Sequence, residues 1–164
     1  MSDPTDAAPD PAASMPRAPA LVLPDQHGAE QVLSDILIHN PALLVFYPFA
    51  FSSICGNELN ELHHQLQPTL TDRNIQLLAI SCDPIYALRT YADREEFPFP
   101  LLSDFWPHGE AARAYGVFDE AKGCATRGSF LVARDGTIRW SLVNPISQAR
   151  PLSAYHDAIA LLGA

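Results

Sequence analysis

The sequence predicts an α/β fold in which a central mixed β-sheet is flanked by helices. Two continuous apolar runs, at residues 43–47 and 76–80, are typical of strands that are buried on both faces of a sheet. A segment with helical spacing separates them, so the two strands are expected to run parallel. Near the carboxyl terminus, two further strand-like runs flank the turn residues 134–136, which is the pattern of a β-hairpin.

The composition fits one globular domain. The chain has 164 residues, of which 48% are hydrophobic, so it can enclose an apolar core. Its formal net charge of −9 disfavours nucleic acid and anionic membrane surfaces as partners. No apolar run could span a membrane, and the start of the chain lacks the pattern of a secretion signal. The three widely spaced cysteines, without a Cys-x-x-Cys motif, fit a reducing, cytoplasmic setting.

Residues 1–19 differ from the rest because they are almost all Ala, Pro, Asp and Ser. Such a segment cannot bury enough apolar surface to offset the entropy that is lost on ordering. We therefore expect a disordered tail followed by one domain over residues 20–164. Met15 lies inside the tail, and deletion of the residues before it is expected to leave the domain unaffected.

The domain is expected to begin with short elements. The apolar residues 21–23 lead into a turn at 24–28, whose Pro, Asp and Gly are turn formers. Residues 32–35 suggest a short strand and a second turn. The buried strand at 43–47 follows and stops at Pro48.

A helix is expected over residues 53–67. Leu59, Leu62 and Leu66 recur at helical spacing, and Pro68 marks the expected end because proline interrupts helical hydrogen bonding. The later elements are, in chain order, a strand at 76–80, a helix from about Pro84, an extended segment at 97–102, a short helix at 109–115, paired strands at 129–132 and 137–142, and a last helix at 151–162.

This order of elements describes an α/β sandwich like that of thioredoxin. Parallel strands that are joined by a right-handed crossover end at the same edge of the sheet, where open α/β folds place their sites. Cys55 follows the first buried strand and Cys82 follows the second. Both cysteines are therefore expected at that edge.

Cys55 lies where a thiolate can be stabilised. With Ser52 or Ser53 as the N-cap, it falls in the first turn of the expected helix, where free N–H groups and the helix dipole favour negative charge. Such a position can lower a cysteine pKa from about 8.5 to roughly 3.5–7.5. A purely structural cysteine fits the same pattern, because free cysteines are often buried as small apolar residues.

Pro48, Ser52 and Cys55 resemble the Pro-x-x-x-Thr/Ser-x-x-Cys signature of the peroxiredoxin family. The similarity continues in four further segments, which are residues 21–28, 99–109, 114–118 and 127–130. In the last three segments the chain resembles the AhpE subgroup of actinobacterial one-cysteine peroxiredoxins. The resemblance covers about residue 20 to the end of the chain.

The resemblance implies roles for five residues. Cys55 is implied as the peroxidatic thiolate, Arg127 as the cation beside it, and Glu58 as the acceptor that orients Arg127. Ser52 is implied as a hydroxyl donor, and Pro48 as a shield of the sulfur from water. From spacing alone, Arg127 would be a solvated arginine and Glu58 an acid favoured by the helix dipole. Most members have threonine in place of Ser52, so positioning of the peroxide is expected to be looser here.

Reduction of the oxidised cysteine is the open step. The product is a sulfenic acid, which needs a second thiol. Members that resolve it within the same helix carry a cysteine five residues after the first, where this chain has Asn60. Cys82 and Cys124 stay candidates for internal resolution. We favour an external reductant, either a low-molecular-weight thiol or a redoxin, such as mycothiol or a mycoredoxin-type protein.

The sequence and the resemblance together predict an antioxidant, thiol-dependent peroxidase. It is expected to reduce hydrogen peroxide and organic hydroperoxides without a metal or an organic cofactor. The resemblance also implies a homodimer. Two alternatives stay open, namely a peroxide sensor that relays oxidation to a partner protein, and a peroxidase that resolves internally through Cys82 or Cys124.

Overall fold

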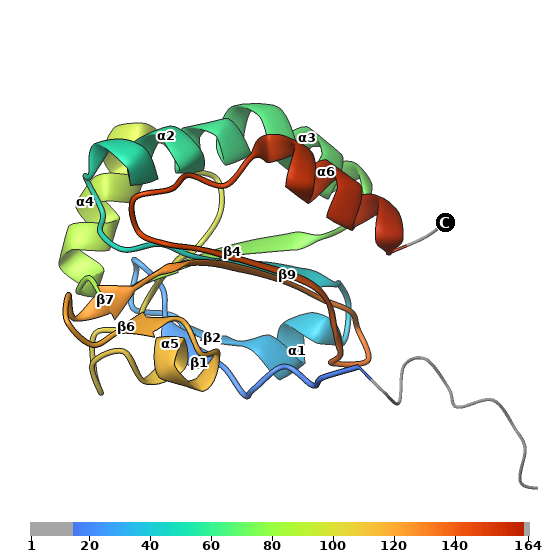
Figure 1. Ribbon diagram of the computed structural model, residues 1–164, viewed down its shortest axis with the longest axis horizontal. Coiled ribbons are helices and arrows are strands. Elements are labelled where there is room, and N and C mark those ends of the chain that lie inside the picture. Colours follow the sequence, from blue (N-terminus) through green and yellow to red (C-terminus); the bar gives the residue numbers. More distant parts are fainter. Residues whose placement is uncertain (1–14, 163–164) are drawn as a thin grey trace, which may run out of the picture.

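The computed structural model describes residues 15–162 and has a five-stranded mixed sheet at its centre (Figure 1). The strands are β1 (Val22–Pro24), β2 (Glu30–Val32), β3 (Ala42–Phe46), β4 (Gln76–Ser81), β5 (Leu101–Ser103), β6 (Phe118–Asp119), β7 (Cys124–Ala125), β8 (Arg127–Val132) and β9 (Ile138–Asn144). The central sheet has the order β5-β4-β3-β8-β9. Strands β3, β4 and β5 are parallel, and β8 is antiparallel to both of its neighbours, which confirms the predicted mixed sheet.

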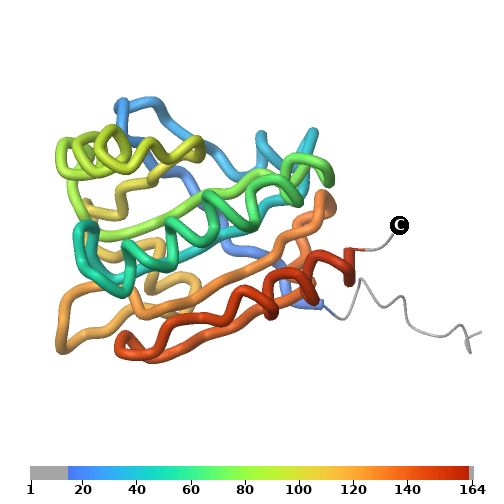
Figure 2. Tube along the Cα trace, turned by 90° about the horizontal axis from the view of Figure 1, so that it is seen from above, coloured from blue at the N-terminus to red at the C-terminus, as the bar shows by residue number. Residues whose placement is uncertain are grey.

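Helices cover both faces of this sheet. They are α1 (Leu33–Leu37), α2 (Ser53–Glu61), the π-helical turn η1 (Leu62–Leu66), α3 (Gln67–Asp72), α4 (Ile85–Glu95), α5 (Glu110–Ala114) and α6 (Leu152–Leu161). The continuous run of α2, η1 and α3 crosses one face beside α6, as the view from above shows (Figure 2). Helices α1 and α5 lie on the opposite face, together with the small sheets β1–β2 and β6–β7.

Strand β3 divides the interior into two apolar clusters. Its residues alternate in direction, as pleating requires. Leu43 and Val45 pack in the cluster beneath α2, α4 and α6, whereas Leu44 and Phe46 pack in the cluster that contains residues of α1 and α5. All of β3 is buried, which explains why the run has no polar alternation.

Two predicted boundaries are wrong. The helix that was expected to end at Pro68 continues to Asp72, because the widened turn η1 precedes the proline, which then lies at the start of α3, where a missing N–H costs little. The turn that was expected at residues 34–35 belongs to helix α1, which buries Leu33 and Leu37 on one face. The hairpin β6–β7 was not predicted, since its strands are only two residues long.

Residues 16–19 contact the domain, so the ordered region begins before the predicted boundary at residue 20. Arg17 forms a β-bridge with Thr137, and the N–H of Ala18 donates to the carbonyl of Gly136 at 2.9 Å. The hydroxyl of Tyr115 donates to the carbonyl of Pro19 at 2.8 Å. Residues 1–14 lie outside the described residues, so disorder there stays a prediction.

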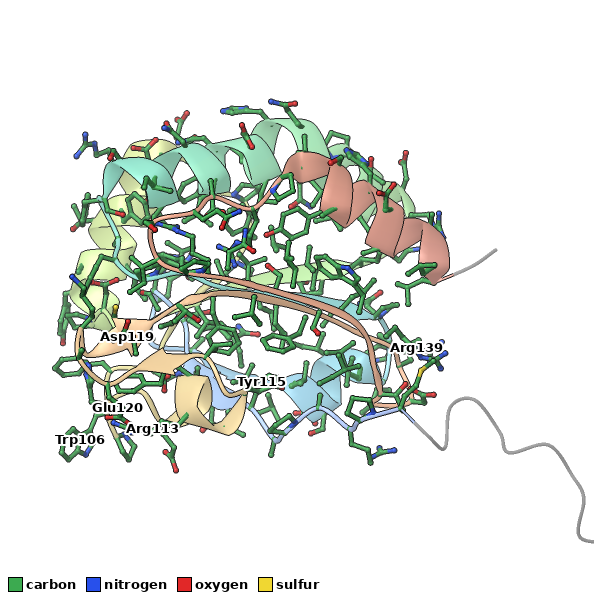
Figure 3. The ribbon with its side chains drawn as sticks, viewed as in Figure 1. Trp106, Arg113, Tyr115, Asp119, Glu120 and Arg139 are labelled. Atoms are coloured by element: carbon green, nitrogen blue, oxygen red, sulfur yellow. The ribbon has the colours of Figure 1, made fainter. Side chains whose placement is uncertain are left out.

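Two labelled residues mark the opposite ends of the central sheet. Asp119, beside the carboxyl ends of the parallel strands, lies at one end of the molecule, and Arg139 of the β8–β9 hairpin lies at the other (Figure 3). Within residues 15–162, no helix is long and apolar enough to cross a membrane.

Candidate active site

Cys55 lies in the first turn of α2, at the carboxyl end of β3. A loop over residues 47–52 joins the two elements, and Ser52 is the N-cap residue. The Cys55 side chain is completely buried. Its position at the helix start is therefore the predicted one, and the local N–H groups and helix dipole favour negative charge there.

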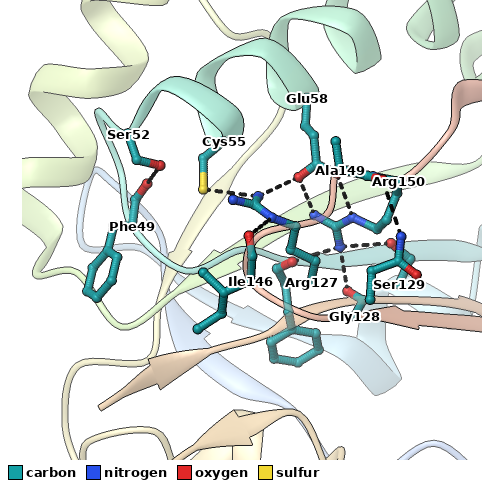
Figure 4. Close-up of polar contacts among 12 residues, drawn as sticks. Phe49, Ser52, Cys55, Glu58, Arg127, Gly128, Ser129, Ile146, Ala149 and Arg150 are labelled. Carbon is teal, nitrogen blue, oxygen red and sulfur yellow. Dashed lines mark hydrogen bonds and ion pairs between the residues drawn. The ribbon is translucent and has the colours of Figure 1, made fainter. Parts of the chain in front are cut away.

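Arg127 supplies a fixed cation at the sulfur of Cys55. Its Nη1 donates to Cys55 Sγ at 3.2 Å and to Glu58 Oε1 at 2.6 Å (Figure 4). Its Nε donates to the carbonyl of Ile146 at 2.6 Å. Arg127 is only 2% exposed, so these contacts hold it away from bulk water. The first residue of β8 thus reaches the first turn of α2, although 72 residues separate them in sequence.

Glu58 is shared between Arg127 and a second buried arginine, Arg150. The backbone N–H of Arg150 donates to Glu58 Oε2 at 2.6 Å, and its Nη2 donates to Oε1 at 3.0 Å. Burial alone would raise the pKa of Glu58, but hydrogen bonds and charge from Arg150, together with the charge of Arg127, hold it below its usual value. Glu58 is therefore ionised at neutral pH.

Arg150 was not identified from the sequence. Its Nη1 donates to the carbonyls of Phe46 and Gly128 at 2.8 and 3.0 Å, and to Ser129 Oγ at 3.0 Å. It therefore ties the ends of β3 and β8 to the carboxylate of Glu58. The one available signal was weak: a cation just before α6 is unfavourable beside a helix N-terminus unless it has a partner.

The buried charges of the site do not cancel. Arg127 and Arg150 carry two positive charges, and Glu58 carries one negative charge. Burial of an unpaired cation is costly, so this arrangement favours a second negative group in contact with Arg127. The sulfur of Cys55 occupies that position at 3.2 Å.

A pocket of about 520 Å³ opens beside the sulfur. Apolar side chains form much of its wall, and these are Pro48, Phe49, Ile54, Pro145 and Ile146. Polar residues complete the lining, and these are Ser52, Ser53, Asp119, Lys122, Thr126, Arg127 and Ser147. Cys55 lies directly behind the pocket, because its neighbour Ile54 and its partner Arg127 both line it.

Pro48 and Ser52 line the pocket, but the hydroxyl of Ser52 does not face Cys55. It donates to the carbonyl of Phe49 at 3.1 Å and does not cap α2 (Figure 4). Serine lacks the γ-methyl group that restricts threonine, so its hydroxyl can adopt this alternative direction. Of the five residues singled out in the sequence, Cys55 and Glu58 each contact Arg127 directly.

Cys82 and Cys124 are buried free thiols. Burial, with the charge of Asp104, raises the pKa of Cys82 to about 12. Burial, with the charge of Asp119, raises the pKa of Cys124 to about 11. Both therefore stay protonated at neutral pH. Among residues 15–162, no cluster of three or more His, Cys, Asp or Glu side chains could hold a metal ion.

Comparisons with known proteins identify relatives of this chain. The model of the AhpC/TSA family matches residues 16–141. Alkyl hydroperoxide reductase E of Mycobacterium tuberculosis is 41% identical over 147 residues, which cover 90% of this chain and 95% of that protein. The crystal structure of Enterococcus faecalis AhpC is similar with a TM-score of 0.79 and 27% identity, over 88% of this chain and 89% of that chain. Peroxidoxin BcpB from Mycobacterium tuberculosis has a TM-score of 0.77 and 25% identity, over 90% of this chain and 94% of that chain.

Family, fold and site lead to one assignment. The family match spans most of the chain, and the structural neighbours have the predicted thioredoxin-like fold. A helix-start cysteine in contact with a fixed cation is the arrangement that activates a thiol nucleophile. The chain therefore belongs to the AhpC/TSA family of peroxiredoxins, which are thiol-dependent peroxidases.

Proposed function

We propose that Cys55 is the peroxidatic cysteine and that it reduces hydrogen peroxide and organic hydroperoxides. The observation that carries this proposal is the 3.2 Å contact between Arg127 Nη1 and Cys55 Sγ in the first turn of α2. Both the guanidinium and the helix start favour the thiolate, which is the nucleophilic form.

The reaction is a displacement at oxygen. The sulfur of Cys55 attacks one peroxide oxygen, an S–O bond forms, and the O–O bond breaks. The departing oxygen gains negative charge and takes up a proton, which gives water or an alcohol and leaves Cys55 as a sulfenic acid. Arg127 stabilises the developing charge because its direction is already fixed by Glu58 and Ile146.

Ser52 and Pro48 act on the substrate side of the pocket. The hydroxyl of Ser52 can donate to a bound peroxide once it rotates away from the carbonyl of Phe49. Pro48 offers no N–H and shields the sulfur from water with its ring. In Ser52→Thr, the γ-methyl group would restrict rotation of the hydroxyl, and this variant is expected to react faster with peroxide.

The pocket wall supports alkyl hydroperoxides as well as hydrogen peroxide. Phe49, Ile54 and Ile146 offer apolar surface to an alkyl group, while Arg127 lies at the reacting end. The relative from Mycobacterium tuberculosis is named an alkyl hydroperoxide reductase, in agreement with such a substrate.

We propose a one-cysteine mechanism with an external reductant. The raised pKa values of Cys82 and Cys124 leave almost no thiolate to attack the Cys55 sulfenic acid at neutral pH. A low-molecular-weight thiol or a redoxin, such as mycothiol or a mycoredoxin-type protein, then completes the cycle. We further propose that the chain works as a cytoplasmic homodimer, which sedimentation at several concentrations would test.

The direct test is Cys55→Ser. This variant should lose peroxide reduction, whereas Cys82→Ser and Cys124→Ser should oxidise at the wild-type rate. Peptide mapping without reduction, after one equivalent of peroxide, should find sulfenic acid at Cys55 and no disulfide. A quantitative Cys55–Cys82 or Cys55–Cys124 disulfide would instead make the protein an internally resolving enzyme. Repeated turnover with an added thiol separates an enzyme from a stoichiometric sensor.

A further inference from the structure

The loop over residues 47–52 forms part of the pocket wall, and its conformation depends on contacts with the rest of the domain. It carries Pro48 and Ser52 into the pocket wall and leads into the turn that holds Cys55. Phe51 in this loop has a φ of 68°, in the left-handed region that bulky side chains rarely adopt. A loop that contains such a residue keeps its shape only when the surroundings hold it.

Asp83 contacts this loop from outside through a hydrogen bond of its side chain. Its Oδ2 accepts the backbone N–H of Ala50 at 2.9 Å and the hydroxyl of Ser81 at 2.7 Å. Its own carbonyl accepts the hydroxyl of Ser103 at 2.6 Å. Ser81 ends β4 and Ser103 ends β5, so the half-buried Asp83 connects the loop to the ends of two neighbouring strands.

The charge of an aspartate at this place has an electrostatic cost. Its negative charge opposes ionisation of nearby groups and contributes to the raised pKa values of Cys82 and Cys124. An asparagine could accept the same N–H without that charge. The geometry therefore separates two roles that a substitution can distinguish, namely the hydrogen-bond acceptor and the charge.

We propose that Asp83 is a positioning residue for peroxide reduction. By accepting the N–H of Ala50, its carboxylate keeps the loop in the shape that holds Pro48 and Ser52 against the peroxide. This inference rests on the proposed role of Cys55. Loss of the contact lowers the fraction of molecules with a competent pocket, and the rate of Cys55 oxidation falls by that fraction at every pH.

Rapid mixing of the full chain with hydrogen peroxide tests the inference across a range of pH. Asp83→Ala should slow Cys55 oxidation roughly tenfold to a hundredfold at every pH tested. Asp83→Asn should stay close to the wild-type rate, because its Oδ1 still accepts the N–H of Ala50. Asp83→Ser, whose side chain is too short for this contact, should be slow like Asp83→Ala and serves if the alanine protein does not fold.

Asp135 provides a matched control at the far end of the sheet. Its Oδ1 accepts a backbone N–H and a hydroxyl, both from Thr137, at 2.9 and 2.6 Å. It lies in the hairpin beside Arg139, away from the pocket (Figure 3). Asp135→Ala should lower the melting temperature and leave the oxidation rate of the folded protein unchanged.

Three outcomes would overturn the inference. A wild-type rate for folded Asp83→Ala or Asp83→Ser would leave Asp83 with a structural role alone. Faster oxidation in both Asp83→Ala and Asp83→Asn would identify a charge that merely opposes the thiolate. Absence of Cys55 oxidation in the wild-type protein would remove the proposed function and this inference together, and the wild-type measurement alone would reveal it.

Discussion

Arg127 has three fixed partners, and this decides what its charge can do. The sulfur of Cys55, the carboxylate of Glu58 and the carbonyl of Ile146 hold the guanidinium in one orientation. A cation that is already oriented stabilises a transition state without the cost of reorganisation. Glu58 is itself held by Arg150, so the orientation depends on a residue that does not touch the sulfur.

Removal of the Arg127 charge is expected to slow the reaction of Cys55 with peroxide. Arg127→Gln should slow peroxide attack by roughly a hundredfold in rapid-mixing experiments, because the fixed cation next to the sulfur is lost. The matched control is Arg113→Gln, since Arg113 is exposed and pairs with Glu120 at the surface. A rate of Cys55 oxidation that equals that of the wild type would show that Arg127 has no part in the reaction.

The three thiols should differ in reactivity. Burial raises the pKa of Cys82 to about 12 and that of Cys124 to about 11, so both stay protonated between pH 7 and 9. Cys55 adjoins the pocket and contacts Arg127. At pH 8, iodoacetamide should therefore label Cys55 alone in the native protein and all three thiols after unfolding, as peptide mass spectrometry would record. Equal labelling of Cys124 in the native protein would contradict this expectation.

At the scale of elements, the start of β8 sets the position of the cation. Gly128 follows Arg127, and its carbonyl accepts a hydrogen bond from Arg150. A β-carbon at Gly128 would lie 2.6 Å from Cγ1 of Val117, which is closer than real contacts allow. The glycine therefore lets β8 pack against the segment before β6 while Arg127 reaches the site.

A larger residue at this position should disturb both packing and catalysis. Gly128→Ala is expected to lower the free energy of unfolding by about 1–3 kcal/mol through overpacking and to slow Cys55 oxidation as the strand start shifts. The double variant Gly128→Ala/Val117→Ala removes the clashing atoms and should recover part of both losses. Urea unfolding and rapid mixing measure the two effects. If the double variant recovers neither, contact with Val117 is not the cause.

For the whole molecule, the folded domain includes residues 16–19, which lie before its predicted boundary at residue 20. The segment 16–19 pairs with the β8–β9 hairpin through Arg17 and Ala18. The carbonyl of Pro19 accepts a hydrogen bond from the hydroxyl of Tyr115. These contacts join the first described residues to the last two strands of the sheet. They were invisible in the composition, because the segment is as rich in Ala and Pro as the residues before it.

Two truncations should locate this boundary. Deletion of residues 1–14 is expected to leave melting temperature and peroxidase activity unaltered, because this composition buries little apolar surface. Deletion of residues 1–19 should lower the melting temperature. It removes the β-bridge between Arg17 and Thr137 and the Pro19 carbonyl that accepts the hydrogen bond of Tyr115. Calorimetry of the two proteins makes the comparison. A loss of stability in the shorter deletion would show that residues before Met15 contribute to the fold.

The sequence predicted the buried strands well because burial on both faces leaves a strong local signal. Strands β3 and β4 were found in this way, whereas the β8–β9 hairpin was found from its turn residues 134–136. Prediction from the sequence failed where the tertiary structure or a neighbouring turn overrides the local conformational preference of a segment. Pro68 does not end its helix, because a π-helical turn precedes it. The two-residue strands β6 and β7 form only because the folded domain brings them together.

By itself, the sequence determined that a cysteine opens a helix at the carboxyl end of a buried strand, because N-capping residues and apolar periodicity are local properties. The family resemblance implied Arg127 as the cation beside that cysteine, but only the tertiary structure showed the contacts that fix it and the parts of Arg150 and Asp83. Arg127, Arg150 and Asp83 lie 72, 95 and 28 positions from Cys55 in the chain. A charge or a hydrogen bond depends on distance in space, and no spacing along the chain records where the crossovers of a sheet will bring such side chains together.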